Sequence, residues 1–374
     1  MGLDRELDGI LVVSLEQAVA APYCGLLLRD AGARVIKVER PDGDFARGYD
    51  KGAGGRSSFF AWLNRGKESI SLDLNQPEDE ALLRSLLRKA DVFLHNLAPG
   101  ALQRRGFGYA ALAAENPGLI SCELSGYGRS GAASGKKAYD FLVQGEAGIC
   151  AVTGTEDQPA RVGVSITDIS TGLTAFSSIL RALIQRGRTG EGMELTLSMF
   201  DVMADWMNMP LLDYRYVGRH PRRMALTHPH IAPYGAFSTA DDSQVLISVQ
   251  NDREWVSLCE NVLAKPELGT DPRFLHNPDR IGNREAVEAE LNAVFGKYTR
   301  TELMTKLQAA KIACSQLSTV EDLSEHELLR NLTVRYAETE LAVADLPVQI
   351  DGERARDVPL LDQHGAAIRA EFGG

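Results

Sequence analysis

Short apolar runs alternate with amphipathic helical patterns between residues 9 and 125, and this alternation restricts the folds open to the chain. Residues 9–14 are typical of a buried parallel strand, a helix is expected over 22–32, and 33–39 should be the next strand. Further strands are expected at 70–74, 91–95 and 119–124, with a helix at 77–89. Because strands that alternate with helices form βαβ units, the sequence predicts an α/β fold with a mostly parallel sheet.

The pattern changes after about residue 205. The strand at 193–197 and the apolar helix at 199–209, which Pro210 should end or kink, are followed by a stretch without clear period up to 227. Paired strands at 234–237 and 245–249 and helices at 283–296 and 300–310 then indicate a smaller unit. Ser318 with Glu321 should open another helix, residues 341–350 are strand-like, and 362–371 should be a final helix.

Composition and charge exclude several classes of protein. The 374 residues suggest two domains, and the net charge of −11 argues against a general nucleic-acid surface, although a local group of cations could still bind phosphates. No run approaches 18 apolar residues and the start has no apolar leader region, so we expect a cytoplasmic protein without a membrane partner. The five cysteines form no C-x-x-C pair, which indicates reduced thiols and neither a disulfide framework nor a zinc site.

Asp168 carries the strongest chemical signal. It follows the apolar segment 163–167 and precedes a helical pattern, so we expect it where a strand passes into a helix. Backbone N–H groups and the positive end of the helix dipole would keep its carboxylate ionised at neutral pH, as a carboxylate nucleophile requires. The alternative, that Asp168 or Ser170 only caps the helix, stays open because Ser and Asp are both preferred cap residues.

Loop cations are the second candidate feature. Arg and Lys side chains suit phosphoryl oxygens, with ordinary surface charge as the alternative for each of Arg40, Arg104, Arg105, Lys136 and Lys137. The pair His228 and His230 could suit a metal by spacing, but no third ligand is evident, so no metal site is expected.

A dinucleotide dehydrogenase is the first enzyme class to consider, because Glu39 ends the second strand where a ribose-binding acid would stand. The loop after the first strand contains no G-x-G-x-x-G, and Pro22 removes one N–H group from the start of the helix that would bind phosphate. The sequence also contains no Walker loop and no G-x-S-x-G elbow. These nucleotide-binding and hydrolase classes are therefore disfavoured.

A set of motifs spread over nearly the whole chain is more informative. They are GARVIKVERP at 32–41, NRGKESISLDL at 64–74, ADV at 90–92, NLAPGAL at 96–102, GYG at 126–128, AYD at 138–140 and TGEG at 189–192. Together they resemble the family III CoA-transferases, the CaiB/BaiF group. The resemblance implies a Rossmann-like large domain at 1–205, a connector and smaller α+β domain at 206–324, a return segment at 325–374 that completes the large domain, and an interlocked homodimer.

The resemblance also implies residue roles. It makes Asp168 the catalytic aspartate, which forms a mixed anhydride with the acyl group of an acyl-CoA and then an aspartyl-CoA thioester. It implies substrate contacts at Gln17, Tyr139 and Asp140. It implies a CoA site lined by Val19, Ala20, Arg40, Leu72, Asp73, Leu74, Asn75, Asn96, Leu97, Ala98, Arg104, Lys137 and Ala138. The CoA thioester would be a substrate, with no prosthetic group.

Two alternatives share this fold. The α-methylacyl-CoA racemases resemble the chain but show Gly-His-Asp where this sequence has Ala138-Tyr139-Asp140, and a Tyr is a poor replacement for the histidine base. A CoA-binding protein without activity would not need Asp168. Oxalate-type members carry a run of glycines that is absent near 249–252, so the resemblance favours C4–C5 dicarboxylates such as itaconate or mesaconate, with succinyl-CoA as donor.

Overall fold

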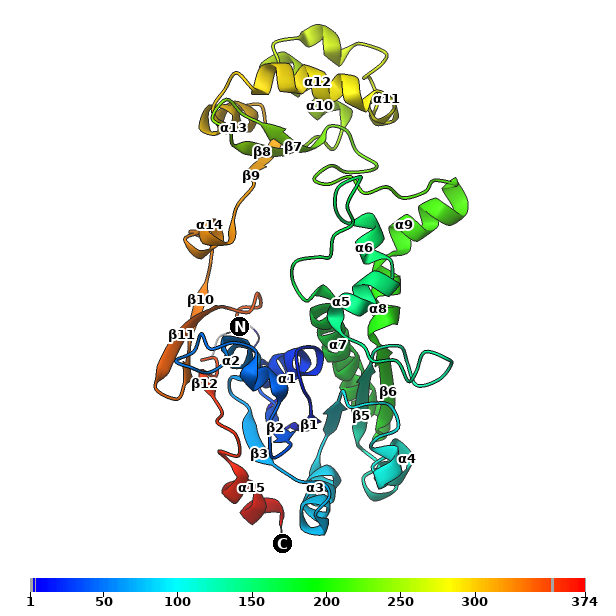
Figure 1. Cartoon of the computed structure of the whole chain (residues 1–374), viewed down its shortest axis with the longest axis vertical. Helices are drawn as coiled ribbons and strands as arrows, with labels where there is room; N and C mark the ends of the chain where they lie inside the picture. Colours follow the sequence, from blue (N-terminus) through cyan, green and yellow to red (C-terminus); the bar gives the residue numbers. More distant parts are fainter. Residues whose placement is uncertain (1–2, 4, 351–352, 374) are drawn as a thin grey trace. The chain divides into compact units, whose positions relative to one another are not determined.

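The computed structural model describes residues 3, 5–350 and 353–373, and it divides into two compact units (Figure 1). Unit 1 comprises the chain up to Cys150, Arg161–Arg219 and the chain from Arg330; unit 2 comprises Ala151–Ala160 and His220–Leu329. Residues 206–219 thus belong to unit 1 and 151–160 to unit 2, which differs from the segment boundaries expected from the sequence. The first two residues of the expected large domain lie outside the described residues.

Unit 1 is built on a six-stranded sheet in the order β3-β2-β1-β4-β5-β6, and every neighbouring pair is parallel. Its strands are β1 (Leu11–Leu15), β2 (Arg34–Glu39), β3 (Glu68–Ser71), β4 (Val92–His95), β5 (Ile120–Ser125) and β6 (Met193–Ser198). This is the Rossmann strand order, in which the direction of strand addition reverses between β1 and β4. The α/β fold predicted from the alternating pattern is confirmed.

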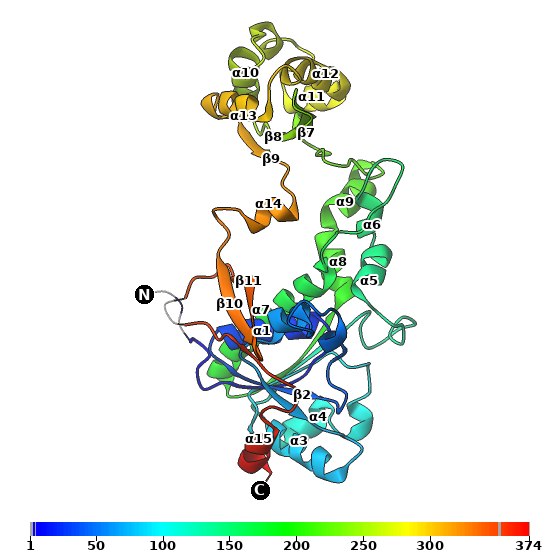
Figure 2. The same ribbon diagram turned by 60° about the vertical axis from the view of Figure 1, so that its left-hand side comes forward.

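Helices cover both faces of this sheet (Figure 2). One face packs against α1 (Ala20–Asp30) and α7 (Ile166–Thr189), and the other against α3 (Pro77–Lys89), α4 (Tyr109–Glu115) and α15 (Gly365–Phe372). Neighbouring residues of β1 separate the two cores, because Val12 packs with α1 and α7 while Val13 packs with α3. That alternation is what a strand buried on both sides requires.

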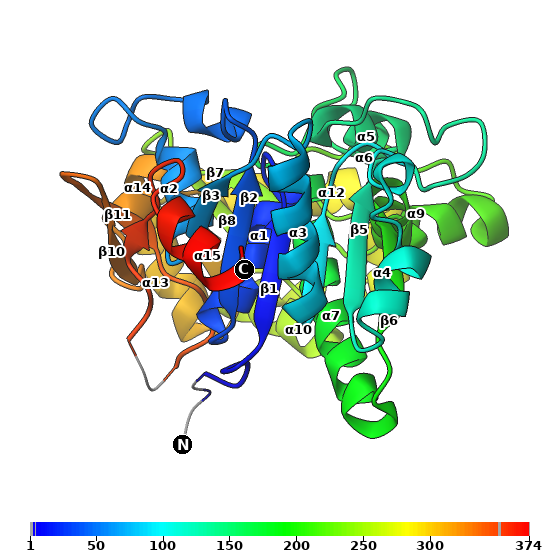
Figure 3. The ribbon, with the colours of Figure 1, turned by 90° about the horizontal axis from the view of Figure 1, so that it is seen from below.

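The end of the chain returns to unit 1 as an antiparallel hairpin of β10 (Asn331–Tyr336) and β11 (Thr339–Ala344), with β12 (Asp357–Val358) parallel to β10. The expected strand at 341–350 therefore ends at Ala344, and its partner β10 was missed. The hairpin packs against α2 (Ser58–Asn64), where Phe60 stacks on Tyr336 with ring centroids 5.9 Å apart. Figure 3 shows α15 running beside α3 at the end of the chain.

The segment before Asp168 is not a strand, which corrects the prediction for 163–167. Its polar groups are satisfied locally: the N–H of Val162 donates to Oε1 of Gln144 at 2.9 Å, and Ser165 is the N-cap of α7. Val164 is exposed. The run has no neighbouring strand with which to pair: residues 163–165 form a loop, and Ile166 and Thr167 already belong to α7.

Downstream of β6 the connector is more helical than expected. The helix α8 (Met199–Trp206) ends before Pro210, and α9 (Asn208–Leu212) begins with Pro210 in its first turn. Proline is tolerated there because the first N–H groups of a helix have no partner within the helix. A π-helical turn, Asp213–Val217, follows. Two short helices, α5 (Asp140–Glu146) and α6 (Ile149–Val152), precede α7.

Unit 2 has an antiparallel sheet of β7 (Tyr234–Ser238), β8 (Gln244–Ser248) and β9 (Ala313–Gln316), with its core formed around Trp255. Its helices are α10 (Asp252–Asn261), α11 (Asn277–Gly282), α12 (Arg284–Phe295), α13 (Arg300–Ala309) and α14 (Val320–Ser324). The expected capping box of Thr299 with Glu302 is confirmed, whereas the next helix is capped by Thr319 with Asp322, one residue later than expected. No helix in the described ranges is both long and apolar enough to cross a membrane.

Candidate active site

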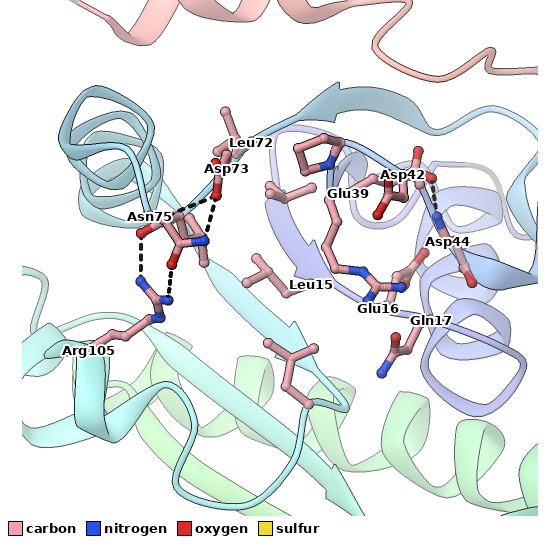
Figure 4. Close-up of a pocket in the computed structure, with 16 residues that line it drawn as sticks. Leu15, Glu16, Gln17, Glu39, Asp42, Asp44, Leu72, Asp73, Asn75 and Arg105 are labelled. Carbon is pink, nitrogen blue, oxygen red and sulfur yellow. Dashed lines mark hydrogen bonds between the residues drawn. The ribbon is translucent and has the colours of Figure 1, made fainter.

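A cavity of about 430 Å³ opens in unit 1 beside the carboxyl ends of β1, β2 and β3 (Figure 4). Open α/β sheets bind ligands at this edge, next to the point where the strand order reverses. The cavity brings together six predicted CoA-site residues and one predicted substrate-site residue: Arg40, Leu72, Asp73, Leu74, Asn75, Leu97 and Gln17. Glu16, Glu39, Asp42 and Asp44 also line it. Figure 4 shows Gln17 and Asp44 on one side and Asp73 and Asn75 on the other.

The cations near this cavity have different environments. Arg105 lines it and donates to the carbonyl oxygen of Leu74 at 2.6 Å and to Oδ1 of Asn75 at 2.7 Å. Arg104, which precedes it in the chain and was predicted to line the CoA site, is exposed on the same turn and does not line the cavity. Arg40 is exposed at the cavity wall. In the described part of the chain, neither the Arg40 nor the Arg104 side chain has an ion pair or hydrogen bond, so both cations are available to a ligand.

Four other predicted CoA-site residues lie next to the cavity rather than in its lining. Val19 and Ala20 are buried where α1 begins. Both amide atoms of Asn96 bind the backbone of Gln17: Oδ1 accepts its N–H at 3.0 Å, and Nδ2 donates to its carbonyl oxygen at 2.8 Å. Ala98 is exposed in the loop that follows β4. Asn96 therefore shapes the loop after β1 through its side chain.

The loop after β5 carries Lys137, Ala138 and Tyr139. Ala138 packs so closely on the backbone of Gly126 that a Cβ at position 126 would overlap the Cβ of Ala138. Lys136 is neutralised by Glu146, with Nζ and Oε1 2.6 Å apart, while Lys137 is exposed without an ion pair among the described residues. Tyr139 is 60% exposed and stands directly before α5.

Asp140, not Asp168, caps the helix that carries the predicted nucleophile. Oδ1 of Asp140 accepts the N–H groups of Thr167 at 2.8 Å and of Asp168 at 3.2 Å, and Oδ2 accepts from Nε2 of Gln144 at 2.7 Å. Asp168 is the third residue of α7, and its side chain makes no capping hydrogen bond. The capping alternative left open for Asp168 is thus excluded, and its carboxyl oxygens are not committed to the helix end.

This arrangement changes the protonation expected for Asp168. Burial, and secondly the negative charge of Asp140, raise the pKa of Asp168 to about 7. The sequence had predicted a carboxylate kept ionised at neutral pH by backbone N–H groups and by the helix dipole. That expectation is wrong, because the side chain is largely buried, and because Asp140 takes the helix N–H groups and adds a like charge. The carboxyl group of Asp168 therefore changes its charge in the neutral pH range.

Sequence reasoning missed Tyr49. Burial, followed by the charges of Asp44 and Asp168, raises the pKa of Tyr49 to about 12, so its phenol lies within electrostatic reach of the predicted nucleophile. The ring also meets those of Phe45 and Phe59 edge-on, with centroids 5.7 Å and 6.2 Å away. Nothing in the local sequence marks this residue, since it lies in a Gly-rich loop without periodicity.

The fold and this site define a class of protein. The family model described as CoA-transferase family III matches residues 7–365, and the chain belongs to that family. It is therefore an enzyme that acts as a CoA-transferase, as the motifs predicted.

Named relatives cover almost the entire chain. An acetyl-CoA:oxalate CoA-transferase from Acetobacter aceti is 36% identical over 98% of this chain and 95% of its own length. A succinyl-CoA:mesaconate CoA-transferase from Haloarcula hispanica is 32% identical over 98% of this chain and 96% of its own length. The crystal structure of a CaiB/BaiF family protein from Brucella suis matches with a TM-score of 0.85 and 34% identity over 100% of both chains.

Proposed function

We propose that this enzyme transfers CoA from an acyl-CoA to a free dicarboxylic acid through covalent intermediates on Asp168. The observation that carries the proposal is the state of that side chain. It lies at the N-terminus of α7, partly buried, while Asp140 satisfies the helix N–H groups in its place. A carboxylate with uncommitted oxygens and a pKa of about 7 is largely ionised in mildly basic solution and can attack a thioester.

The proposed steps balance without a further reactant. The carboxylate of Asp168 attacks the acyl carbonyl, and the C–S bond breaks to give a mixed anhydride and the CoA thiolate. The thiolate attacks the aspartyl carbonyl and releases the donor acid, which leaves an aspartyl-CoA thioester. The acceptor carboxylate attacks that thioester, forms a second anhydride and again frees the thiolate. The thiolate finally takes the acceptor acyl group and regenerates Asp168. Water must be excluded throughout, because it would hydrolyse the anhydrides.

Three loop cations are proposed to hold the CoA phosphates: Arg40, Arg104 and Lys137. All three are exposed and have no carboxylate partner in the ranges that the structure describes, whereas Lys136 is paired with Glu146 and Arg105 is bound to the loop at 74–75. Unpaired Arg and Lys side chains can bind phosphoryl oxygens without first breaking an ion pair.

The acceptor is proposed to be a short dicarboxylate, with C4–C5 acids such as itaconate or mesaconate and succinyl-CoA as the first pair to test. The names of relatives support the class: one acts on oxalate, one on mesaconate, and a third, from Agrobacterium fabrum, is a succinate–glutarate CoA-transferase 32% identical to this chain. All of these acids carry two carboxyl groups, so oxalate and glutarate belong in the same panel.

We also propose the homodimer. Large apolar side chains are exposed along α7, α8, α9 and the π-helical turn of a single chain: Leu173, Ile184, Trp206, Met209, Leu212, Tyr216 and Val217. Exposed apolar surface on this scale is typical of an interface between chains. Light scattering of the purified protein should give the mass of two chains; a monomer would contradict the proposal.

The central test replaces the nucleophile. Asp168→Ala should lose transfer between succinyl-CoA and the acid panel by several orders of magnitude, since removing a covalent catalyst abolishes its pathway. Asp201→Ala is the matched control, because Asp201 occupies the same third position in α8. Reduction with borohydride after adding acyl-CoA should modify Asp168 in the wild type. An Asp168→Ala variant that keeps more than about a tenth of the activity would refute the assignment.

A further inference from the structure

The loop that follows β1 is held almost entirely by side chains. Besides the two bonds from Asn96 to Gln17, the carbonyl oxygen of Glu16 accepts from Nζ of Lys37 at 3.1 Å. The N–H of Ala18 donates to Oδ1 of Asp44 at 3.1 Å. Three residues from three different segments thus fix the backbone of Glu16, Gln17 and Ala18, between the first strand and the helix that begins at Ala20.

Ala18 needs such support because its backbone is in the left-handed region, with φ +64°. A residue with a Cβ is disfavoured there, whereas glycine adopts the conformation readily. The hydrogen bond from the Ala18 N–H to Asp44 stabilises this left-handed backbone conformation. The same carboxylate oxygen accepts the N–H of Ala46 at 2.9 Å, so Asp44 also caps the turn that follows it.

Asp44 is itself fixed from behind. Its Oδ2 lies 2.9 Å from Nζ of Lys37, and both side chains are fully buried. Lys37 lies in β2, where Ile36 and Val38 on either side belong to the core. Burial by itself disfavours the ammonium form, but the charges of Asp44 and Glu16 outweigh it and raise the pKa of Lys37. A charged Lys37 therefore holds the side chain of Asp44 under the loop.

We infer that Asp44 is a positioning residue for acyl-CoA binding: from its contact with Lys37 it holds Ala18 in the left-handed conformation and so places Gln17 in the cavity wall. Asp44 lines the same cavity, but its two carboxyl oxygens are occupied by Ala18, Ala46 and Lys37. It acts through the loop and not on the reacting atoms. This inference rests on the proposed CoA site, and it adds a role that the motifs do not assign.

The test combines substitution with rescue. Asp44→Asn should raise KM for acyl-CoA about tenfold while kcat falls much less, because its single amide oxygen cannot accept both from Nζ of Lys37 and from the N–H groups of Ala18 and Ala46. Ala18→Gly added to Asp44→Asn should restore most of that KM, because glycine adopts the left-handed conformation without the hydrogen bond. A general loss of packing would not be repaired in this way.

Hydrogen exchange provides a readout independent of activity. The amides of Gln17 and Ala18 should exchange about tenfold faster in Asp44→Asn than in the wild type, and Ala18→Val, which leaves Asp44 and Lys37 intact, should show the same local effect. Asp30→Asn is the matched control. Like Asp44, Asp30 pairs with a buried cation, in its case Arg65, but it lies at the far end of α1. It should lower stability without changing KM or these two amides.

The outcomes separate the two proposals. Unchanged KM and unchanged exchange in folded Asp44→Asn overturn the positioning role, as does a raised KM that Ala18→Gly leaves uncorrected. If Asp44→Asn does not fold, Ala18→Val decides. The positioning role is then overturned when the Gln17 amide of Ala18→Val exchanges as slowly as that of the wild type. Failure of the wild type to bind CoA would refute the proposed CoA site, and the exchange rates would still decide whether Asp44 holds the loop.

Discussion

The charge of Asp140 can be removed while its place in the structure is kept. Asp140→Asn retains an oxygen that accepts the N–H groups of Thr167 and Asp168, and Gln144 can turn its amide to meet the new side chain only by giving up the bond from the Val162 N–H to its Oε1. What disappears is the negative charge beside Asp168. The pKa of Asp168 should therefore fall, since a like charge no longer opposes its ionisation.

The size of this change follows from the two causes. The pKa of Asp168 rises from 3.8 to about 7, and burial is the larger cause, with Asp140 second. A rise of roughly 3 pH units corresponds to about 4 kcal/mol, of which Asp140 supplies less than half. Asp140→Asn should thus move the pKa of Asp168 down by about 1 pH unit, to about 6.

The assay is the pH dependence of kcat/KM for transfer from succinyl-CoA. In the wild type the rate should rise with pH through a midpoint near the pKa of about 7, because only ionised Asp168 attacks. In Asp140→Asn the same rise should occur at lower pH. A midpoint that stays in place, or moves upward, would refute the electrostatic coupling between the two carboxyl groups.

Stability gives a second measure of the same pKa. A carboxyl group whose pKa is raised in the folded state stabilises fully below its unfolded pKa of 3.8, and that stability is lost as pH rises through about 7. Asp168→Asn avoids this loss. Its free energy of unfolding should exceed that of the wild type by roughly 2–4 kcal/mol at basic pH, discounted for partial exposure, and match it at acidic pH.

Three further outcomes are expected. Alanine at any one of the unpaired loop cations should raise KM for acyl-CoA roughly tenfold or more with little change in kcat, while Lys136→Ala should not; equal KM values in all variants would contradict the site formed by Arg40, Arg104 and Lys137. A 2-methylacyl-CoA incubated in heavy water should gain no deuterium at its α-carbon, whereas uptake without transfer to any acid would establish the racemase. Gly172→Ala should lower the free energy of unfolding by about 1–3 kcal/mol in denaturant titration, because the new Cβ would lie 2.5 Å from the carbonyl oxygen of Ala20; an unchanged midpoint would show that α1 and α7 can separate freely.

The sequence predicted the parallel core of unit 1 well because its strands are short apolar runs between strong helix signals. The helix α3 was predicted at its observed bounds, since Pro77 begins it and four leucines mark its buried face. Strand β10 was missed although Asn331 to Tyr336 alternate between exposed polar and buried apolar side chains, which is the pattern of a half-buried strand.

The protonation of the site could not be predicted in the same way. The position of Asp168 at a helix start was visible, but the side chain that caps that helix comes from Asp140, 28 residues earlier. The buried pair of Lys37 with Asp44 had a weak signal, a lysine inside an otherwise apolar strand, whose meaning depends on which loop folds over it. Local patterns give positions; the environment of a charge depends on contacts distant in the chain.

The return of the chain to unit 1 has a consequence for how the protein is made. Ile368 and Phe372 of α15 belong to the same core as β1 and α3, and Val334 and Tyr336 of the hairpin cover Phe60. A chain still emerging from the ribosome therefore has the proposed nucleophile, Asp168, and all six strands of the parallel sheet before it has the residues that seal one sheet face. The part of unit 1 that is synthesised first keeps apolar surface exposed to solvent and chaperones until the segment from Arg330 onward has been synthesised. A premature stop codon even close to the end would leave that surface uncovered, although every proposed catalytic residue had already been synthesised.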